Sequence, residues 1–231
     1  MFSRFELLIG EEKLNQLQNK HIIVFGVGGV GGYVIEALVR SGIEHIAIVD
    51  NDVVSLTNLN RQIIATQQSI DQKKVDVMKE RIMSINPRCD IHTLEMFYLP
   101  ETADEIDLSQ YDYVIDAIDT ITAKIELAVR CEKLSIPLIS SMGTGNKMNP
   151  SMLEVTDIYK TSVCPLAKVM RHELKARRVK HLKVVYSKEV PIKPMVSSEQ
   201  TNKRTVPGST AFVPSSAGLL IASEVIKDLL L

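Results

Sequence analysis

A run of glycines between an apolar segment and a helical one constrains the fold of this chain most strongly. The segment 21–25, HIIVF, indicates a buried strand, and GVGGVGG at 26–32 follows it directly. A helical pattern then begins at about Gly29, runs to Arg40 and is capped by Gly42. A strand, a tight glycine turn and a helix in this order predict the first unit of a parallel α/β fold.

The next hundred residues repeat this alternation. Short runs rich in β-branched residues alternate with segments of helical period, which predicts parallel strands joined by crossover helices. The predicted strands are 46–49, 91–94, 113–116 and 137–140, and the predicted helices cover 75–85 and 121–134. We therefore expect an α/β fold of Rossmann-like, doubly wound type, with a mainly parallel sheet.

The regular alternation ends after about Gly143. A basic helix at 167–178 and a strand at 182–186 are predicted there, and the polar stretch 195–209 is expected to be a mobile loop. An apolar helix at 217–230 closes the chain. We interpret residues 1–231 as a single domain, with a core at about 4–145 and 210–231 and a basic insertion or cap at about 146–209. The C-terminal extension is thus predicted to be irregular.

The composition excludes several classes of protein. With 231 residues and 45% hydrophobic content the chain can build one full core, and 27 Lys and Arg against 28 Asp and Glu give it no dominant charge. Three widely spaced cysteines without a C-x-x-C pair argue against a disulfide framework or a zinc knot. No run of about 18 apolar residues occurs. We expect a soluble, cytoplasmic protein without a membrane partner.

The glycine run also predicts a nucleotide site. Gly26, Gly28 and Gly31 fit G-x-G-x-x-G, which lets the backbone approach a phosphate at the start of a helix. Asp50 ends the next predicted strand, at the spacing of a carboxylate that binds a ribose hydroxyl. The alternative is that the glycines serve helix packing alone, but the acidic partner favours nucleotide binding.

Charged side chains near the same sheet edge favour a triphosphate over a dinucleotide. Arg61 and Lys74 could both reach phosphates, and Asp119 follows the fourth predicted strand, where it could hold magnesium. A dinucleotide needs no such set of cations and metal ligand. Each charge alone is more often a solvated surface residue, and it is their joint position around one crevice that favours a triphosphate.

Taken in order, these motifs resemble the adenylation domain of the ubiquitin-activating and sulfur-carrier-activating enzymes. The matching residues are Gly26, Gly28, Gly29, Val30, Gly31, Asp50, Asp52, Asn58, Asn60, Arg61, Gln62, Gln72, Lys74, Asn86, Pro87, Asp116 and Asp119. Within this superfamily the chain is most similar to the bacterial tRNA threonylcarbamoyladenosine dehydratases. That narrower similarity rests on Arg4-Phe5, on the phrase YVIDAID at 113–119 and on VTDI at 155–158 leading to PLA at 165–167.

The resemblance implies an activity and a set of roles. It implies ATP-dependent adenylation of a nucleoside carboxylate in the tRNA anticodon loop, followed by ring closure with loss of water. The implied nucleotide-binding residues are Gly26, Gly28, Gly29, Gly31, Asp50, Asp52, Asn58, Arg61, Gln62, Lys74 and, from the partner subunit of a homodimer, Arg4. Arg61, Lys74 and Asp119 are the implied catalytic set, with Asp119 on Mg²⁺. A monovalent cation and a cysteine-desulfurase or sulfur-carrier partner stay open.

One position departs from the family pattern. Cys164 stands before Pro165 where relatives commonly carry Asp, so a thiol lies near the expected substrate side. A nucleophilic cysteine would suit thioester transfer, but the sequence assigns it no acid or base, and a free cysteine is usually a small buried hydrophobe. We expect Cys164, like Cys89 and Cys131, to belong to the core.

A basic segment predicts the nucleic-acid surface. Between positions 168 and 183 seven Lys and Arg residues face one Glu, the clearest charge cluster in the chain. The predicted nucleic-acid-binding residues are Lys168, Arg171, Lys175, Arg177, Arg178 and Lys180. Such a stripe fits contact with a phosphate backbone. The alternative is a merely solvated helix face, since aromatic residues for base stacking are scarce there.

Three other functions stay open at this stage. An activating enzyme for a small sulfur-carrier protein would use the same ATP site, although many such enzymes carry the paired C-x-x-C zinc ligands that this chain lacks. A nicotinamide-dependent oxidoreductase would not need Arg61, Lys74 and Asp119. A non-catalytic nucleotide-binding regulator would not release pyrophosphate from ATP.

Overall fold

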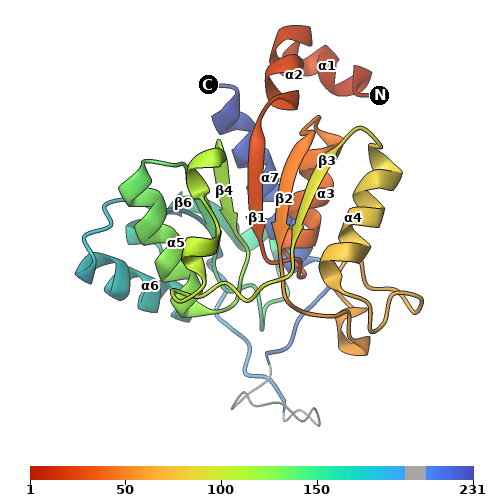
Figure 1. Cartoon of the computed structure of the whole chain (residues 1–231). Helices are drawn as coiled ribbons and strands as arrows, with labels where there is room; N and C mark the ends of the chain where they lie inside the picture. Colours follow the sequence, from red (N-terminus) through yellow and green to blue (C-terminus); the bar gives the residue numbers. More distant parts are fainter. Residues whose placement is uncertain (196–206) are drawn as a thin grey trace.

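A seven-stranded sheet forms the centre of the computed structural model, which describes residues 1–195 and 207–231 (Figure 1). The strands, in chain order, are β1 (His21–Phe25), β2 (His45–Val49), β3 (Asp90–Leu94), β4 (Tyr113–Asp116), β5 (Leu138–Ser141), β6 (Leu153–Asp157) and β7 (Lys183–Ser187). Their order across the sheet is β3-β2-β1-β4-β5-β7-β6. All neighbouring pairs are parallel except β6 and β7. The predicted α/β class and mainly parallel sheet are therefore confirmed.

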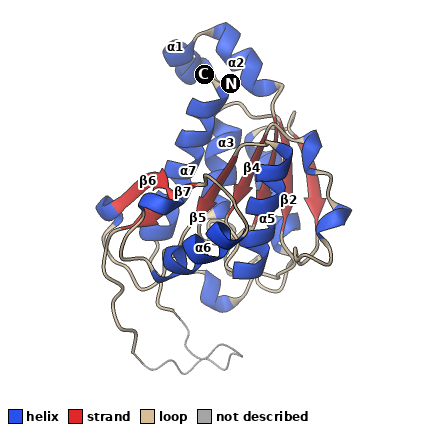
Figure 2. Ribbon diagram, turned by 90° about the vertical axis from the view of Figure 1, so that its left-hand side faces the viewer, coloured by secondary structure: helices blue, strands red, loops and turns tan. Residues whose placement is uncertain are grey.

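Helices cover both faces of the sheet (Figure 2). They are α1 (Ser3–Ile9), α2 (Glu11–Gln18), α3 (Gly31–Arg40), α4 (Lys74–Ile85), α5 (Ile121–Leu134), α6 (Pro165–Ala176) and α7 (Val213–Leu229). The apolar faces of α3, α4 and α7 pack on one side, and α5 and α6 pack on the other. Within the two described ranges, no helix is long and apolar enough to cross a membrane.

The first strand and its turn are determined locally. Four of the five β1 residues are buried, because parallel strands covered on both faces are apolar throughout. Gly26 then takes a φ of +95°, which favours glycine, and a Cβ there would lie 2.7 Å from the carbonyl oxygen of Ala117. The chain can therefore leave β1 in a sharp turn that lies directly against the end of β4.

The last helix closes the fold over α3, the helix that follows the glycine turn. α7 packs on α3, and Gly218 permits the close approach, since a Cβ would lie 2.5 Å from the carbonyl oxygen of Val30. The carboxylate of Asp228 accepts hydrogen bonds from the Tyr113 hydroxyl at 2.6 Å and from Lys183 Nζ at 2.7 Å. Because Pro214 and Gly218 of α7 lie against Gly29 and Val30, the amino end of α7 lies beside the glycine turn.

The segment after Gly143 joins the sheet. β7 pairs with β5 and β6 pairs with β7, while α6 packs against α5. The sequence did not indicate β6, because all five of its residues are half-buried and its residues mix polar and apolar types. The predicted mobile loop at 195–209 falls largely outside the described residues.

Candidate functional site

A pocket of about 320 Å³ opens where the carboxyl ends of the central strands meet. The turns after β1, β2, β3 and β4 all contribute to it, as expected for ligand sites of open α/β sheets. Its lining residues are Gly26, Gly28, Gly29, Val30, Val49, Asp50, Asn51, Asp52, Asn58, Arg61, Gln62, Lys74, Met96, Phe97, Tyr98, Ala117, Ile118, Asp119, Thr144, Ser209 and Pro214. Most of the sequence-predicted nucleotide residues therefore come together in one cavity.

Asp50 braces the glycine turn. Its carboxylate accepts hydrogen bonds from the backbone N–H groups of Val27 at 2.6 Å and of Asp52 at 2.8 Å, and its side chain is 10% exposed. These contacts hold the loop after β2 against the loop after β1. Because the first N–H groups of a helix lack partners within it, the start of α3 can face an anion.

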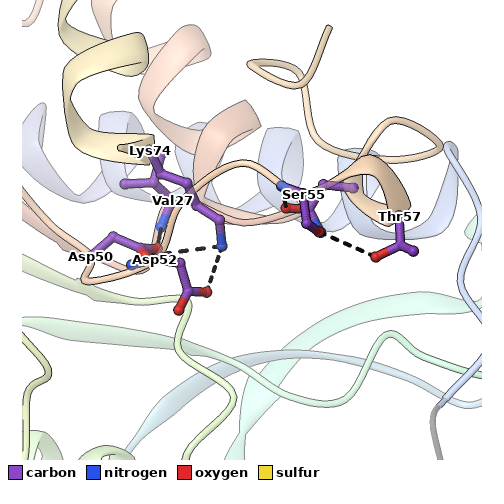
Figure 3. Close-up of polar contacts among 7 residues, drawn as sticks. Val27, Asp50, Asp52, Ser55, Thr57 and Lys74 are labelled. Atoms are coloured by element: carbon purple, nitrogen blue, oxygen red, sulfur yellow. Dashed lines mark hydrogen bonds and ion pairs between the residues drawn. The ribbon is translucent and has the colours of Figure 1, made fainter. Parts of the chain in front are cut away.

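Lys74 lies between two carboxylates at the edge of the pocket (Figure 3). Its Nζ lies 2.7 Å from Asp52 and 4.0 Å from Asp50, and its side chain is 7% exposed. Lys74 is also the first residue of α4, and its N–H donates to the carbonyl oxygen of Asp52. The lysine is therefore held in place before any ligand arrives.

A short 3₁₀ helix, Leu56–Asn58, and the turn after it contribute three polar residues to the same cavity, which are Asn58, Arg61 and Gln62. Asn58 accepts from the N–H of Ser55, and Arg61 donates from Nη1 to the carbonyl oxygen of Thr57 at 2.9 Å. Gln62 is 7% exposed, and its Oε1 has no hydrogen-bond partner in the described part of the chain. An orphaned buried polar atom lining a pocket is typical of a group that binds a ligand.

The two acidic residues at the carboxyl end of the fourth strand, Asp116 within it and Asp119 after it, have different surroundings. Asp119 lines the pocket and is exposed, whereas Asp116 is fully buried and pairs with Lys124. No cluster of three His, Cys, Asp or Glu side chains able to hold a metal occurs in residues 1–195 and 207–231. Mg²⁺ bound to a triphosphate takes only one or two protein carboxylates, so Asp119 fits that ion.

Two of the predicted residues do not line the pocket. Gly31 begins α3 and lies tightly against the backbone of the glycine turn. Arg4 is on α1, which lies beyond the amino ends of the strands, at the opposite end of the molecule (Figure 1). It lines a separate cavity there together with Arg40 of α3. A role for Arg4 at the site would thus require a second copy of the chain and stays a prediction.

Other pocket residues were not foreseen from the sequence. Met96, Phe97 and Tyr98 follow β3 and form an apolar wall. The carboxyl-end rule could have indicated them, because the strand before them was predicted. Pro214, at the start of α7, lies against Gly29, where a Cβ would be 3.3 Å from its own. No motif marks that position.

A second cavity of about 450 Å³ adjoins the first. The two share Arg61 and Ser209, whereas the cavities around Arg4 and around Cys131 share no residue with either. Exposed apolar side chains, Met148 and Ile192, stand on its wall. Arg61 thus lines both cavities.

Asn146 holds the walls of the second cavity together. It exchanges hydrogen bonds with the backbone of Gly208 at 2.7 Å and accepts from the N–H of Ile192 at 2.8 Å. The neighbouring Lys147 is 3% exposed and donates to the carbonyl oxygen of Ser187. Burial lowers the pKa of this lysine. The cavity is therefore built from three chain segments fixed to one another.

The predicted nucleic-acid residues divide into two groups. Arg171 donates to the backbone of Thr161, and Arg177 pairs with Glu173 at 2.6 Å. The other four residues are exposed on and after α6, and they are Lys168, Lys175, Arg178 and Lys180. The structure thus leaves the second group better placed than the first for an external polyanion.

The three cysteines are buried. Burial raises the pKa of the Cys89 and Cys131 thiols to about 12, so neither is a thiolate at neutral pH. Cys164 is 1% exposed and packs in the cluster beneath α6 with Met142 and Met170. It does not line the pocket at the carboxyl ends of the central strands. This burial favours the core interpretation of Cys164.

Comparison with known proteins places this geometry in a family. The model of the ThiF family matches residues 2–230. A "tRNA threonylcarbamoyladenosine dehydratase" of Bacillus subtilis is 46% identical over 239 residues, covering 99% of this chain and 94% of that protein. The protein of the same name in Escherichia coli is 41% identical over 169 residues, covering 73% of this chain and 63% of that protein.

Solved structures agree with this assignment. The crystal structure of the E. coli tRNA N6-threonylcarbamoyladenosine dehydratase in complex with ATP has a TM-score of 0.88 and 33% identity, covering 99% of this chain and 93% of that chain. A complex of the same protein with AMP gives a TM-score of 0.89. The E. coli protein MccB, at 19% identity and a TM-score of 0.70, shares the fold.

Proposed function

The chain belongs to the ThiF family, and on that premise we propose that it is an ATP-dependent tRNA dehydratase. It would adenylate the carboxylate of threonylcarbamoyladenosine in the anticodon loop and promote cyclisation of that side chain. The observation that carries the proposal is one polar pocket that joins the glycine turn, Arg61, Lys74 and Asp119, with a second cavity sharing Arg61. Relatives with this name and an ATP complex support it.

The pocket residues suit a nucleoside triphosphate. We assign the phosphates to the start of α3 beside Gly28 and Gly29, the ribose to Asp50, and the triphosphate to Asn58, Arg61, Gln62 and Lys74. The wall of Met96 and Phe97 offers an apolar surface for the base. Asp119 would hold Mg²⁺, which neutralises charge on the phosphates. These assignments are proposals that variants can test.

The proposed reaction balances without a covalent enzyme intermediate. A carboxylate oxygen of the nucleoside attacks the α-phosphorus, the bond from that phosphorus to the bridging oxygen breaks, and pyrophosphate leaves. A nitrogen or hydroxyl oxygen of the same side chain then attacks the acyl carbon, its proton passes to solvent, and AMP leaves with the former carboxylate oxygen. The chain positions two anions and offsets their charge through Arg61 and Lys74. No nucleophilic cysteine is required, which agrees with the burial of Cys164.

The second cavity suits the acceptor. An adenylating enzyme must hold both substrates with their reacting atoms in contact, so the acceptor needs a space that opens into the triphosphate pocket. The adjoining cavity meets this need, since Arg61 and Ser209 line both spaces. Arg61 could then face the acceptor carboxylate and the phosphates together, while Met148 and Ile192 offer apolar contact to an unstacked base.

A direct assay tests the proposed function. The protein is incubated with ATP, Mg²⁺ and unfractionated tRNA, and the tRNA is digested to nucleosides and examined by mass. We expect threonylcarbamoyladenosine to lose one water while AMP and pyrophosphate accumulate. An unchanged nucleoside profile, together with AMP formation driven by a small ubiquitin-like carrier protein, would instead favour adenylation of a sulfur carrier.

Removing exposed basic residues should weaken tRNA binding. Each phosphate contact that is lost reduces the slope of log K against log salt by about 1, so Lys175→Ala with Arg178→Ala should lower it by about 2. The measurement is tRNA affinity at several salt concentrations. Lys13→Ala with Lys79→Ala is the control, because it removes two exposed lysines from other helices. Equal slopes in both double variants would contradict the assignment of α6 to tRNA.

Further features of the enzyme are part of the same proposal. We infer a homodimer in which Arg4 of one chain approaches the site of the other, because Arg4 lies far from its own pocket. Leu7 and Leu8 of α1 are 80% and 81% exposed, which suits a surface covered in an assembly.

A cytoplasmic location follows from the tRNA substrate. A monovalent cation and a sulfur-transfer partner have no residue assigned to them.

A further inference from the structure

A buried ion pair lies directly beneath the wall of the nucleotide pocket. Lys124 of α5 and Asp116 at the end of β4 are 2.9 Å apart, and their side chains are 0% and 1% exposed. Removing two charges from water is costly, and an apolar pair of similar size often stabilises a fold equally well. Stability alone is thus a weak explanation for this pair.

The lysine connects the ends of two strands. Its Nζ donates to the backbone carbonyl oxygen of Ser141 at 2.7 Å and to the hydroxyl of Ser140 at 3.3 Å, both at the end of β5. Ser140 is the registered partner of Asp116 in the sheet, and its hydroxyl also donates to the Asp116 carboxylate. One oxygen of Asp116, the hydroxyl of Ser140 and the carbonyl oxygen of Ser141 therefore all accept hydrogen bonds from the Lys124 ammonium group.

Asp116 connects this hydrogen-bond network to the nucleotide pocket. Its other oxygen accepts the backbone N–H of Ile118 at 3.1 Å, which fixes the turn that begins after β4. Ala117, Ile118 and Asp119 of this turn all line the nucleotide pocket. The N–H of Ala117 donates to the carbonyl oxygen of Phe25, so the same turn is held against the glycine loop.

We propose that Lys124 is a positioning residue for nucleotide-bound Mg²⁺: through Asp116 it fixes the turn that presents the Asp119 carboxylate to the ion. The inference rests on the proposed function, because it takes Mg·ATP as the ligand. Lys124 touches neither nucleotide nor metal in this account. Partners that orient a metal ligand commonly change metal affinity by about 10- to 100-fold when they are replaced.

Calorimetry separates this role from a general structural one. The titrant is an ATP analogue with a non-cleavable α,β linkage, added with Mg²⁺ or with a chelator and without tRNA. The test variant is Lys124→Met with Asp116→Leu, an apolar pair of similar size that avoids an unpaired buried charge. We expect the gain in affinity from Mg²⁺ to fall about tenfold. Affinity in the chelator should stay within about twofold of wild type, because the phosphate and base contacts are unchanged.

Two more variants complete the test. Ser140→Ala removes one hydrogen bond to Asp116 and should reduce the Mg²⁺ gain by about two- to fivefold. If the double variant does not fold, an unchanged Mg²⁺ gain in Ser140→Ala overturns the positioning role. Glu36→Gln disrupts a half-buried ion pair with Arg81 that lines no part of the pocket, so it should leave the gain unchanged.

The outcomes separate the two proposals. An unchanged Mg²⁺ gain in folded Lys124→Met with Asp116→Leu, or an equal loss with and without Mg²⁺, overturns the positioning role. A wild-type protein that does not bind the analogue at all instead contradicts the proposed function. Since the measurement is binding and not turnover, it does not depend on the identity of the acceptor.

Discussion

Arg61→Ala should reduce tRNA-dependent pyrophosphate release by at least about a hundredfold. Arg61 lines both the nucleotide pocket and the adjoining cavity, so loss of its guanidinium removes charge compensation where two anions are proposed to meet. Its own contacts are to neutral oxygens of Thr57 and Asn60 in an exposed loop, so the fold should be retained. Pyrophosphate release and thermal unfolding are to be measured on the same preparation.

Arg88→Ala is the matched control for this variant. Arg88 is 61% exposed on its side chain and pairs with Glu44, near the amino ends of the strands and outside the pocket. It should keep wild-type turnover. If Arg61→Ala turned over ATP as fast as Arg88→Ala, the assignment of Arg61 to the reacting groups would be wrong.

Gly31→Ala should destabilise the protein strongly. A Cβ at position 31 would lie 1.8 Å from the carbonyl oxygen of Gly26, and because that oxygen is a backbone atom no side-chain rotation can relieve the clash. Overpacking of this kind costs about 3 kcal/mol or more. For a domain of this size that corresponds to a melting temperature lower by roughly 6 to 12 °C. Thermal unfolding followed by circular dichroism measures the effect.

Gly28→Ala separates the two uses of the glycine turn. A Cβ at position 28 would have only the Gln62 amide within reach, at 4.0 Å, so the fold should tolerate it. It would nevertheless occupy space where the backbone approaches a phosphate, and ATP affinity should fall about tenfold or more. A destabilised Gly28→Ala, or a Gly31→Ala as stable as wild type, would show that the turn is described incorrectly.

The central strands could be predicted because they are buried on both faces and their sequences are therefore almost wholly apolar. β1, β4 and α5 begin and end where the pattern indicated, since each has apolar residues covered by neighbouring elements. The two edge strands, β3 and β6, both lack a buried residue. β3 could be predicted because it lies within the regular alternation of strands and helices, whereas β6 lies after that alternation ends and was missed. α1 contains no buried residue, so no apolar stripe marks it.

The site was predicted as far as its residues carry charge or glycine. Asp50, Arg61, Lys74 and Asp119 follow predicted strands or begin a helix, and the rule that ligands bind at the carboxyl edge brings them together. Pro214 reaches the pocket only through the packing of α7 on α3, which no local pattern specifies. Asp116 and Asp119 both match the family pattern in the sequence. Only the fold shows that Asp116 is buried and paired with Lys124, away from the pocket.

The proposed function requires attack by the nucleoside carboxylate on the α-phosphorus of ATP, and an isotope experiment tests this step directly. tRNA bearing threonylcarbamoyladenosine labelled with ¹⁸O in the carboxylate is incubated with the protein, ATP and Mg²⁺, and the nucleotide products are examined by mass. We predict that AMP carries one labelled oxygen and pyrophosphate carries none. Formation of ADP with a labelled inorganic phosphate would contradict the account, because the carboxylate would then have attacked the γ-phosphorus.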